Sequence, residues 1–273
     1  MEIMSVDTVT RSTAETAAYY EAVLGLPVRK EIGAVEVAVG RSVLRFREDP
    51  DALGDQHYAF LIDDARFDAA RSFLRAGPGL LGDGDRTEFE AQSAWNARSL
   101  YFPGPDRSVL EVIARRDLPT TLGAGPAPGA KASSLPGPGT QPVPFGPGDL
   151  LCVSEVGIAV PDVVGTADRL TEAGVGRYPD GSDTFSPAGH IDGMLILVRP
   201  GRTWFPTSDR VVGEPPATVI AQAGVASSGV VPGSNDMRGS QYHFCDRSPL
   251  TRPPRTPPGA TPRTPRSTPR SSG

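Results

Sequence analysis

The pattern of apolar and polar positions repeats three times along the chain. Each copy starts with an alternating strand, continues with a short helix that ends at a glycine, and closes with further short strands. The three first strands lie within IMSVDTVT, HYAFLID and SEVGIAVPD. A pattern that recurs in this way is typical of one supersecondary unit used several times, here with the order β-α-β-β-β.

Helix boundaries fall at the same point of each copy. The residues predicted to cap the helix N-termini, because their side-chain oxygens can accept hydrogen bonds from free N–H groups, are Ser12, Asp64 and Asp162. The glycines predicted to end the helices follow 12 or 13 residues later: Gly25, Gly77 and Gly174. Seven residues before each cap, the first strand carries a polar residue: Ser5, His57 and Glu155. Each unit therefore has one strand position where a polar side chain could serve a function.

These units predict an α+β fold made of repeated βαβββ units. Residues 1–117 hold two of them, and we expect this pair to form an eight-stranded, half-open barrel whose concave face lines a cavity. Residues 150–222 hold a third unit, a partial second domain without a partner in the chain. The unmatched unit favours a homodimer, or packing of this unit against the first domain.

Two segments have compositions that do not build a core. Residues 118–149 are dense in Pro, Gly, Ser and Ala, which predicts a linker. Residues 223–273 end in RTPPGATPRTPRSTPRSSG, which predicts a disordered basic tail rich in Pro, Arg and Thr.

The charge of the chain argues against a nucleic-acid-binding surface. The net charge is −5, and residues 223–273 hold seven Arg and two Asp, so the rest of the chain carries about ten excess negative charges.

The sequence has no apolar run of the ~20 residues that a membrane helix needs and no signal-peptide pattern. With 2 cysteines, a disulfide framework is not expected, so we expect a cytoplasmic protein.

Several stretches resemble a known superfamily. YYEAVLGLPV, HYAFLID and YFPGPDRSVLEVIAR lie in the first two units, and SEVGIAVPDV and GMLILVRPGRTWFPT lie in the third. Together they resemble the vicinal oxygen chelate superfamily, which includes glyoxalase I, extradiol ring-cleaving dioxygenases, and the bleomycin and fosfomycin resistance proteins. The resemblance covers roughly residues 1–210 and implies the βαβββ fold, on which several chemistries occur.

The resemblance also implies a metal site. In metal-using members, a divalent ion is held by His or Glu from the first and last strands of each unit, often as two His and one Glu. Carried over to this chain, these positions are Ser5, His57 and Glu111. Serine is a poor ligand because its hydroxyl is neutral, and Asp7, two residues further along the same strand face, could substitute. The implied cofactor is Fe, Mn or Zn.

Other roles stay open for the two stronger candidates. His57 could be a hydrogen-bonding or acid–base group in a metal-free cavity, or an ordinary strand residue. Glu111 lies between apolar neighbours, where an ionised carboxylate is costly unless it is paired, protonated or metal-bound. Strand neighbours alternate in direction, so the superfamily register alone favours an inward Glu111.

Further candidates precede or follow these strands. Trp95 could wall the cavity or belong to the core, and Asn96 could hydrogen-bond a ligand, so both are substrate-binding candidates together with Ser5. In the third unit, Glu155 and His190 could approach one another to form a second metal site.

Two functional hypotheses follow. The first is a metal-dependent, dioxygenase-like or glyoxalase-like enzyme in which His57 and Glu111 act on a small molecule with vicinal oxygens. The layout of two domains with a linker favours the dioxygenase-like form. The second is a metal-free protein that sequesters a small molecule, as the bleomycin resistance proteins do; the serine at position 5 favours it. The sequence holds no nucleophile elbow, phosphate-binding glycine loop or paired-cysteine zinc motif.

Overall fold

The computed structural model describes residues 1–52, 54–92, 94–118, 143–179 and 181–222, and the backbone of 230–232 and 241–245. The first repeat gives β1 (Glu2–Thr10), α1 (Thr13–Ala22), β2 (Val28–Glu31), β3 (Ala34–Val39) and β4 (Ser42–Glu48). The second gives β5 (His57–Ile62), α2 (Phe67–Ala76), β6 (Phe89–Ala91), β7 (Ala97–Pro103) and β8 (Val109–Arg115). The third gives β9 (Cys152–Ala159), α3 (Val163–Glu172), β10 (Phe185–His190) and β11 (Gly193–Val198). After it come β12 (Thr218–Gln222), β13 (Val230–Pro232) and β14 (Gln241–Cys245).

The predicted α+β class with βαβββ repeats is confirmed. The first two repeats have all five elements in the expected order. The third lacks a strand between α3 and β10, where an isolated antiparallel bridge joins Arg177 to Ala188 of β10. This bridge occupies the chain position of the second strand in the other repeats.

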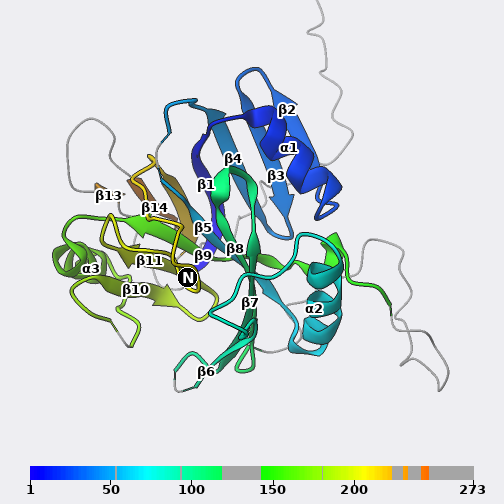
Figure 1. Cartoon of the computed structure of the whole chain (residues 1–273). Coiled ribbons are helices and arrows are strands. Elements are labelled where there is room, and N and C mark those ends of the chain that lie inside the picture. Colours follow the sequence, from blue (N-terminus) through cyan, green and yellow to red (C-terminus); the bar gives the residue numbers. More distant parts are fainter. Residues whose placement is uncertain are drawn as a thin grey trace, which may run out of the picture.

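The strands form two curled sheets of seven strands each (Figure 1). Their strand orders are β13-β14-β12-β1-β4-β3-β2 and β10-β11-β9-β5-β8-β7-β6. In the second sheet, β5 pairs antiparallel with β9, so the second repeat joins the third. In the first sheet, β1 pairs antiparallel with β12, so the first repeat joins the chain's C-terminal strands.

The predicted pairing within residues 1–117 is therefore wrong. The first two repeats lie in different sheets, and the barrel-like sheet has seven strands rather than eight. The free edge of a strand can form hydrogen bonds with any strand that reaches it. Two repeats that follow one another in the sequence therefore need not pair in the same sheet. Because β9 pairs with β5, the third unit packs against the domain predicted over residues 1–117, which is the alternative to a homodimer given above.

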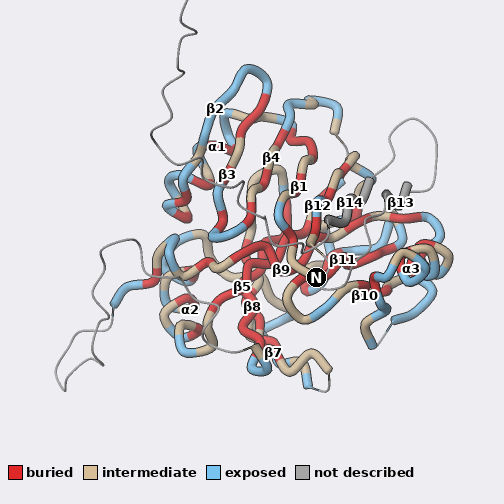
Figure 2. Tube along the Cα trace, turned by 180° about the vertical axis from the view of Figure 1, so that it is seen from behind, coloured by how far each residue is buried: buried red, intermediate tan, exposed pale blue. Residues whose placement is uncertain are grey.

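One apolar core joins the two sheets. In Figure 2 the buried positions follow β5, β8 and β9 through the centre of the molecule. Phe46 of β4 meets Tyr58 of β5 edge-to-face across the sheets, with ring centroids 6.1 Å apart. The buried Ser42 hydroxyl of β4 accepts a hydrogen bond from the Val153 amide of β9 at 2.9 Å. Strand β4 of the first sheet thus packs against strands β5 and β9 of the second sheet.

Two of the three predicted helix caps are confirmed. Ser12 accepts from the backbone N–H of Glu15 at 3.2 Å, and Asp162 accepts from that of Gly165 at 2.9 Å. In the second repeat the capping residue is Asp63, and a 3-10 turn begins at Asp64. Of the predicted helix-ending glycines, Gly25 and Gly174 have positive φ, whereas Gly77 has φ −103°.

The linker and tail predictions fall largely outside the described residues. Residues 119–142 of the predicted linker are not described, but its end is anchored: Asp149 pairs with Arg66 at 2.7 Å, and the Phe145 ring packs on Phe73. Within residues 223–273, β14 pairs with β12 and β13 pairs with β14, and the rest of the predicted tail lies outside the described residues. No helix among the described residues is long and apolar enough to cross a membrane.

Candidate metal centre

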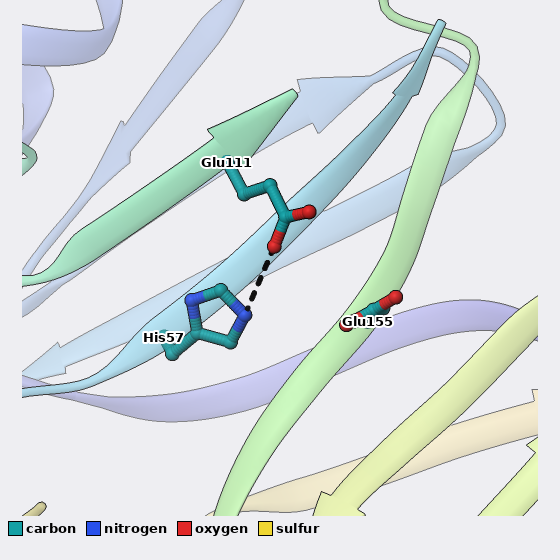
Figure 3. A group of neighbouring side chains, drawn as sticks. All are labelled: His57, Glu111 and Glu155. Atoms are coloured by element: carbon teal, nitrogen blue, oxygen red, sulfur yellow. Dashed lines mark ion pairs between the residues drawn. The ribbon is translucent and has the colours of Figure 1, made fainter. Parts of the chain in front are cut away.

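Three buried polar side chains meet on the concave face of the second sheet. His57 begins β5, Glu111 lies on β8 and Glu155 on β9. One ligand atom from each lies within 4.8 Å of the other two (Figure 3). Ala59 of β5 has Glu111 and Glu155 as its strand partners on either side, and its small side chain leaves space between the carboxylates.

The hydrogen bonds of His57 leave one ring nitrogen available. Its Nδ1 lies 3.0 Å from the Val109 carbonyl oxygen, which can only accept, so Nδ1 carries the proton and Nε2 presents its lone pair. Nε2 lies 3.5 Å from Glu111 Oε2. Burial lowers the pKa of His57 to about 4, so the imidazole is neutral near neutral pH. A neutral imidazole held by a backbone carbonyl is the usual state of a metal ligand.

The two carboxylates have the opposite shift. Burial raises the pKa of Glu111, and the nearby Glu155 raises it further. Burial also raises the pKa of Glu155, against the opposing effect of the Arg115 guanidinium, which forms a buried ion pair with it. The Tyr101 hydroxyl lies within hydrogen-bonding contact of Glu111. The charged form of both carboxylates is therefore disfavoured unless a further cation is present.

This donor set fits a divalent metal. With both carboxylates ionised and the imidazole neutral, one guanidinium faces two negative charges, so the cluster has room for more positive charge. One imidazole nitrogen and two carboxylate oxygens suit Fe, Mn or Zn.

A cavity of about 400 Å³ opens above the cluster. This volume lies in the range of small-molecule sites. Its walls are mainly aromatic and include Phe89, Trp95, Tyr101, Phe185, Trp204 and Phe205. The Trp204 ring packs on the His57 imidazole, with centroids 5.2 Å apart, and its Nε1 donates to the Asp55 carbonyl at 2.8 Å.

The structure separates the sequence-predicted site residues. It brings His57 and Glu111 together and places Trp95 on the cavity wall. Asn96 does not line this cavity, and its Nδ2 donates to Asp117 at 2.7 Å.

Ser5 and Asp7 lie on β1, in the other sheet, beside a separate cavity of about 360 Å³. There Asp7 pairs with Arg45 at 2.9 Å and Arg47 at 2.7 Å. The prediction that Asp7 supplies the third ligand to His57 and Glu111 is therefore wrong, because the two first repeats do not share a sheet.

The third donor is Glu155. The sequence analysis assigned it to the third repeat and to a second metal site with His190. The signal was its position seven residues before the helix cap, the same as that of His57. His190, its expected neighbour, ends β10 with an exposed side chain 3.4 Å from Asp192 and is not part of the cluster.

The repeat relation also identifies the fourth position of the site. Glu111 lies two residues beyond Val109, the strand partner of His57. The corresponding residue of the third repeat lies two beyond Met194, the strand partner of Glu155, and is Ile196. Ile196 lines the cavity and offers no ligand atom, so the protein supplies three donors and leaves the rest of the site to a bound molecule.

The same relation shows that the first sheet lacks this set of donors. There the positions of His57 and Glu111 are taken by Ser5 and by Arg45, which lies two residues beyond Val43, the strand partner of Ser5. A neutral hydroxyl is a weak ligand and a guanidinium is itself a cation, so this pair does not form a metal site. Among the described residues, the candidate metal centre is confined to the second sheet.

Comparison with known proteins agrees with this architecture. No family model and no curated protein matches the chain. A proposed dioxygenase from Bacillus subtilis superposes with a TM-score of 0.54 and 13% identity, over 91% of this chain and 86% of its own. A glyoxalase I variant from Zea mays gives a TM-score of 0.49 and 14% identity, over 90% of this chain and 92% of its own. The chain therefore shares its fold with the Bacillus subtilis protein.

Proposed function

We propose that this chain is a metal-dependent enzyme that acts on a small molecule with vicinal oxygens. His57, Glu111 and Glu155 would hold a divalent ion, Fe, Mn or Zn. The observation that carries the proposal is the buried cluster itself, whose three donor atoms lie within 4.8 Å of one another at the floor of a cavity.

A bound divalent ion would supply a Lewis acid, or a site for oxygen activation, to a substrate that chelates it. The chain's own residues prepare that site. The Val109 carbonyl orients His57, and aromatic side chains line the cavity above it. Glu111 lies at the cavity floor, where its carboxylate would be one of the three groups that hold the ion. Tyr101 has a pKa well above its ordinary value and stays a hydrogen-bond donor.

The metal content of the purified protein tests the proposal. Protein prepared without chelator, and again after reconstitution with Fe, Mn or Zn, should hold the metal near stoichiometry. His57→Ala, Glu111→Gln and Glu155→Gln should each lose it. Asp7→Asn is the matched control, because it also removes a carboxylate charge, but from the other sheet. A wild type that takes up none of the three metals would refute the proposal.

A metal-dependent protein then requires a substrate screen. The names of the structural neighbours, dioxygenase and glyoxalase I, define two reaction classes: ring cleavage of catechols and isomerisation of hemithioacetals. Oxygen consumption with catechols would support the first class, and thioester formation would support the second.

One observation favours a second candidate, a metal-free protein that sequesters a small molecule. Arg115 already gives Glu155 a permanent cation, which lowers the need for a metal. This candidate predicts that an aromatic ligand binds in the presence of chelator and is not turned over.

A further inference from the structure

Two exposed arginines line the cavity, each beside an aromatic ring. Arg86 precedes β6, and its Cζ lies 4.7 Å from the centre of the Phe89 ring. Arg202 follows β11, and its Cζ lies 5.4 Å from the centre of the Phe185 ring of β10. β6 and β10 are the two edge strands of the curled sheet, and both arginines line the cavity. One exposed guanidinium thus lies beside the cavity at each edge strand, and we call these two groups the rim.

Within the described part of the chain, no carboxylate forms an ion pair with either guanidinium. Arg86 uses its Nε to donate to the Glu88 carbonyl at 3.1 Å, which leaves its two terminal nitrogens for other partners. Glu90 also lines the cavity, but its carboxylate is paired with Arg116 at 2.9 Å. The rim thus keeps uncompensated positive charge in a protein that is acidic as a whole.

The space between the rim and the floor is apolar. Aromatic rings from both edges of the sheet line it, with Phe205 packed edge-to-face on Phe89 and on Tyr101 at centroid distances of 4.7 and 5.5 Å. Such walls favour an aromatic or other flat apolar body. The floor carries the three-residue cluster, so a ligand would meet oxygen and nitrogen donors inside and guanidinium groups outside.

We propose that the cavity selects small molecules with an aromatic body and a carboxylate at the outer end, which Arg86 and Arg202 bind. A carboxylate fits because its two oxygens match the fork of guanidinium N–H donors. This inference rests on the proposed function, in that it assigns a substrate class to the same cavity. It depends on the rim and the walls and needs no metal for its test.

Phenylbutyrate and phenylbutanol are a matched pair of probes, because they share an apolar body and differ in the charged end. Trp95 and Trp204 are the 2 tryptophans of the chain, and both line the cavity, so tryptophan fluorescence reports occupancy directly. Titrations of the full-length protein in chelator should show phenylbutyrate binding roughly tenfold more tightly than phenylbutanol. Added salt should reduce that preference, because the guanidinium groups are exposed.

The double variant Arg86→Gln/Arg202→Gln should bind both probes equally, with phenylbutanol affinity unchanged, which shows that the cavity is intact. The control is Arg29→Gln/Arg177→Gln, which removes the same charge from exposed positions outside the cavity and should keep the preference. Equal affinity of the two probes in the wild type, no binding of either, or a preference that survives in the rim variant would overturn the inference.

These outcomes are separate from those of the metal analysis. A protein that holds no metal but prefers phenylbutyrate through its rim arginines would refute the metalloenzyme and support the inference. A protein that holds metal but does not prefer phenylbutyrate would support the metalloenzyme and refute the inference.

Discussion

Arg115 and Glu155 form an ion pair with almost no solvent contact, since their side chains are 0% and 6% exposed. The guanidinium also lies over the Trp95 ring at 5.4 Å and donates its Nε to Ser154 at 3.4 Å. Its Nη1 has no hydrogen-bond partner among the described residues. A permanent cation therefore stands beside the candidate metal centre and holds one of its three donors.

Replacing Arg115 by Met should destabilise the metal-free protein strongly. Glu155 would be left as a buried carboxylate without a counter-ion, a loss on the order of 3–5 kcal/mol. Chemical denaturation in chelator measures this loss. Arg115→Met/Glu155→Gln should recover part of it, because no unpaired charge remains, and an equally unstable double variant would contradict the explanation.

The stability of the metal-free protein should decrease as the pH rises from about 6.5 to about 8, because His57, whose pKa is lowered to about 4, opposes the effect of the glutamates only at lower pH. The pKa of Glu111 is raised to about 8, so above the unfolded-state pKa of a glutamate the folded protein binds more protons than the unfolded chain. The free energy of unfolding then falls through that window. Glu155, with its pKa shifted in the same direction, adds to the effect.

Glu111→Gln should remove part of this fall, on the order of 1–3 kcal/mol between about pH 5 and pH 8. Denaturation curves in chelator at several pH values measure it. Glu90→Gln removes an exposed cavity-lining carboxylate and should keep the wild-type pH dependence. Identical slopes for all three proteins would show that the buried carboxylate does not govern the effect.

A divalent metal should stabilise the wild type and not the Glu155→Gln variant. A ligand that binds only the folded state at a hundredfold excess over its dissociation constant adds about 2.7 kcal/mol. Thermal unfolding with and without Mn or Zn measures the shift in melting temperature. Asp7→Asn should respond like the wild type, and a shift that persists in Glu155→Gln would place the metal elsewhere.

The close approach of β9 to Trp204 requires a glycine. A Cβ at Gly157 would lie 2.3 Å from Cη2 of Trp204 and 3.0 Å from the His57 Cβ. Gly157→Ala should therefore displace the Trp204 ring from His57 and cost about 1–3 kcal/mol. Tryptophan fluorescence and denaturation would detect both changes. Gly176→Ala is the control, since a Cβ there meets no atom within 4 Å.

The repeats were predictable from the sequence because they are local. Alternating strands, capping residues such as Ser12 and Asp162, and turn glycines such as Gly25 act over a few neighbouring residues, and the structure has them in place. The cap of the second helix differs by one residue because Asp63 caps a 3-10 turn, while Asp64 instead binds Arg98 at 2.6 Å.

The composition of the site was predictable only in part, because it depends on which strand edges meet. His57 and Glu111 come from one repeat, and the register of that repeat brings them together. The choice between Asp7 and Glu155 as the third donor depends on whether β5 shares a sheet with β1 or with β9. Hydrogen bonding between backbones is nearly independent of side-chain identity, so no local pattern decides that choice.

The strands of the second sheet lie between β1 and β12 in the sequence, and this has a consequence for folding during synthesis. The half-barrel that holds the cavity is built from the continuous stretch 57–198, so its hydrogen bonds can form as soon as that stretch has been made. β1 precedes this stretch and has to wait for β12, more than two hundred residues later, before its second edge is covered. An early strand with an open edge is a site for pairing with another nascent chain. The first repeat thus keeps an open strand edge after the half-barrel can already have formed, and the period before β12 is made is when pairing with another chain is most favoured.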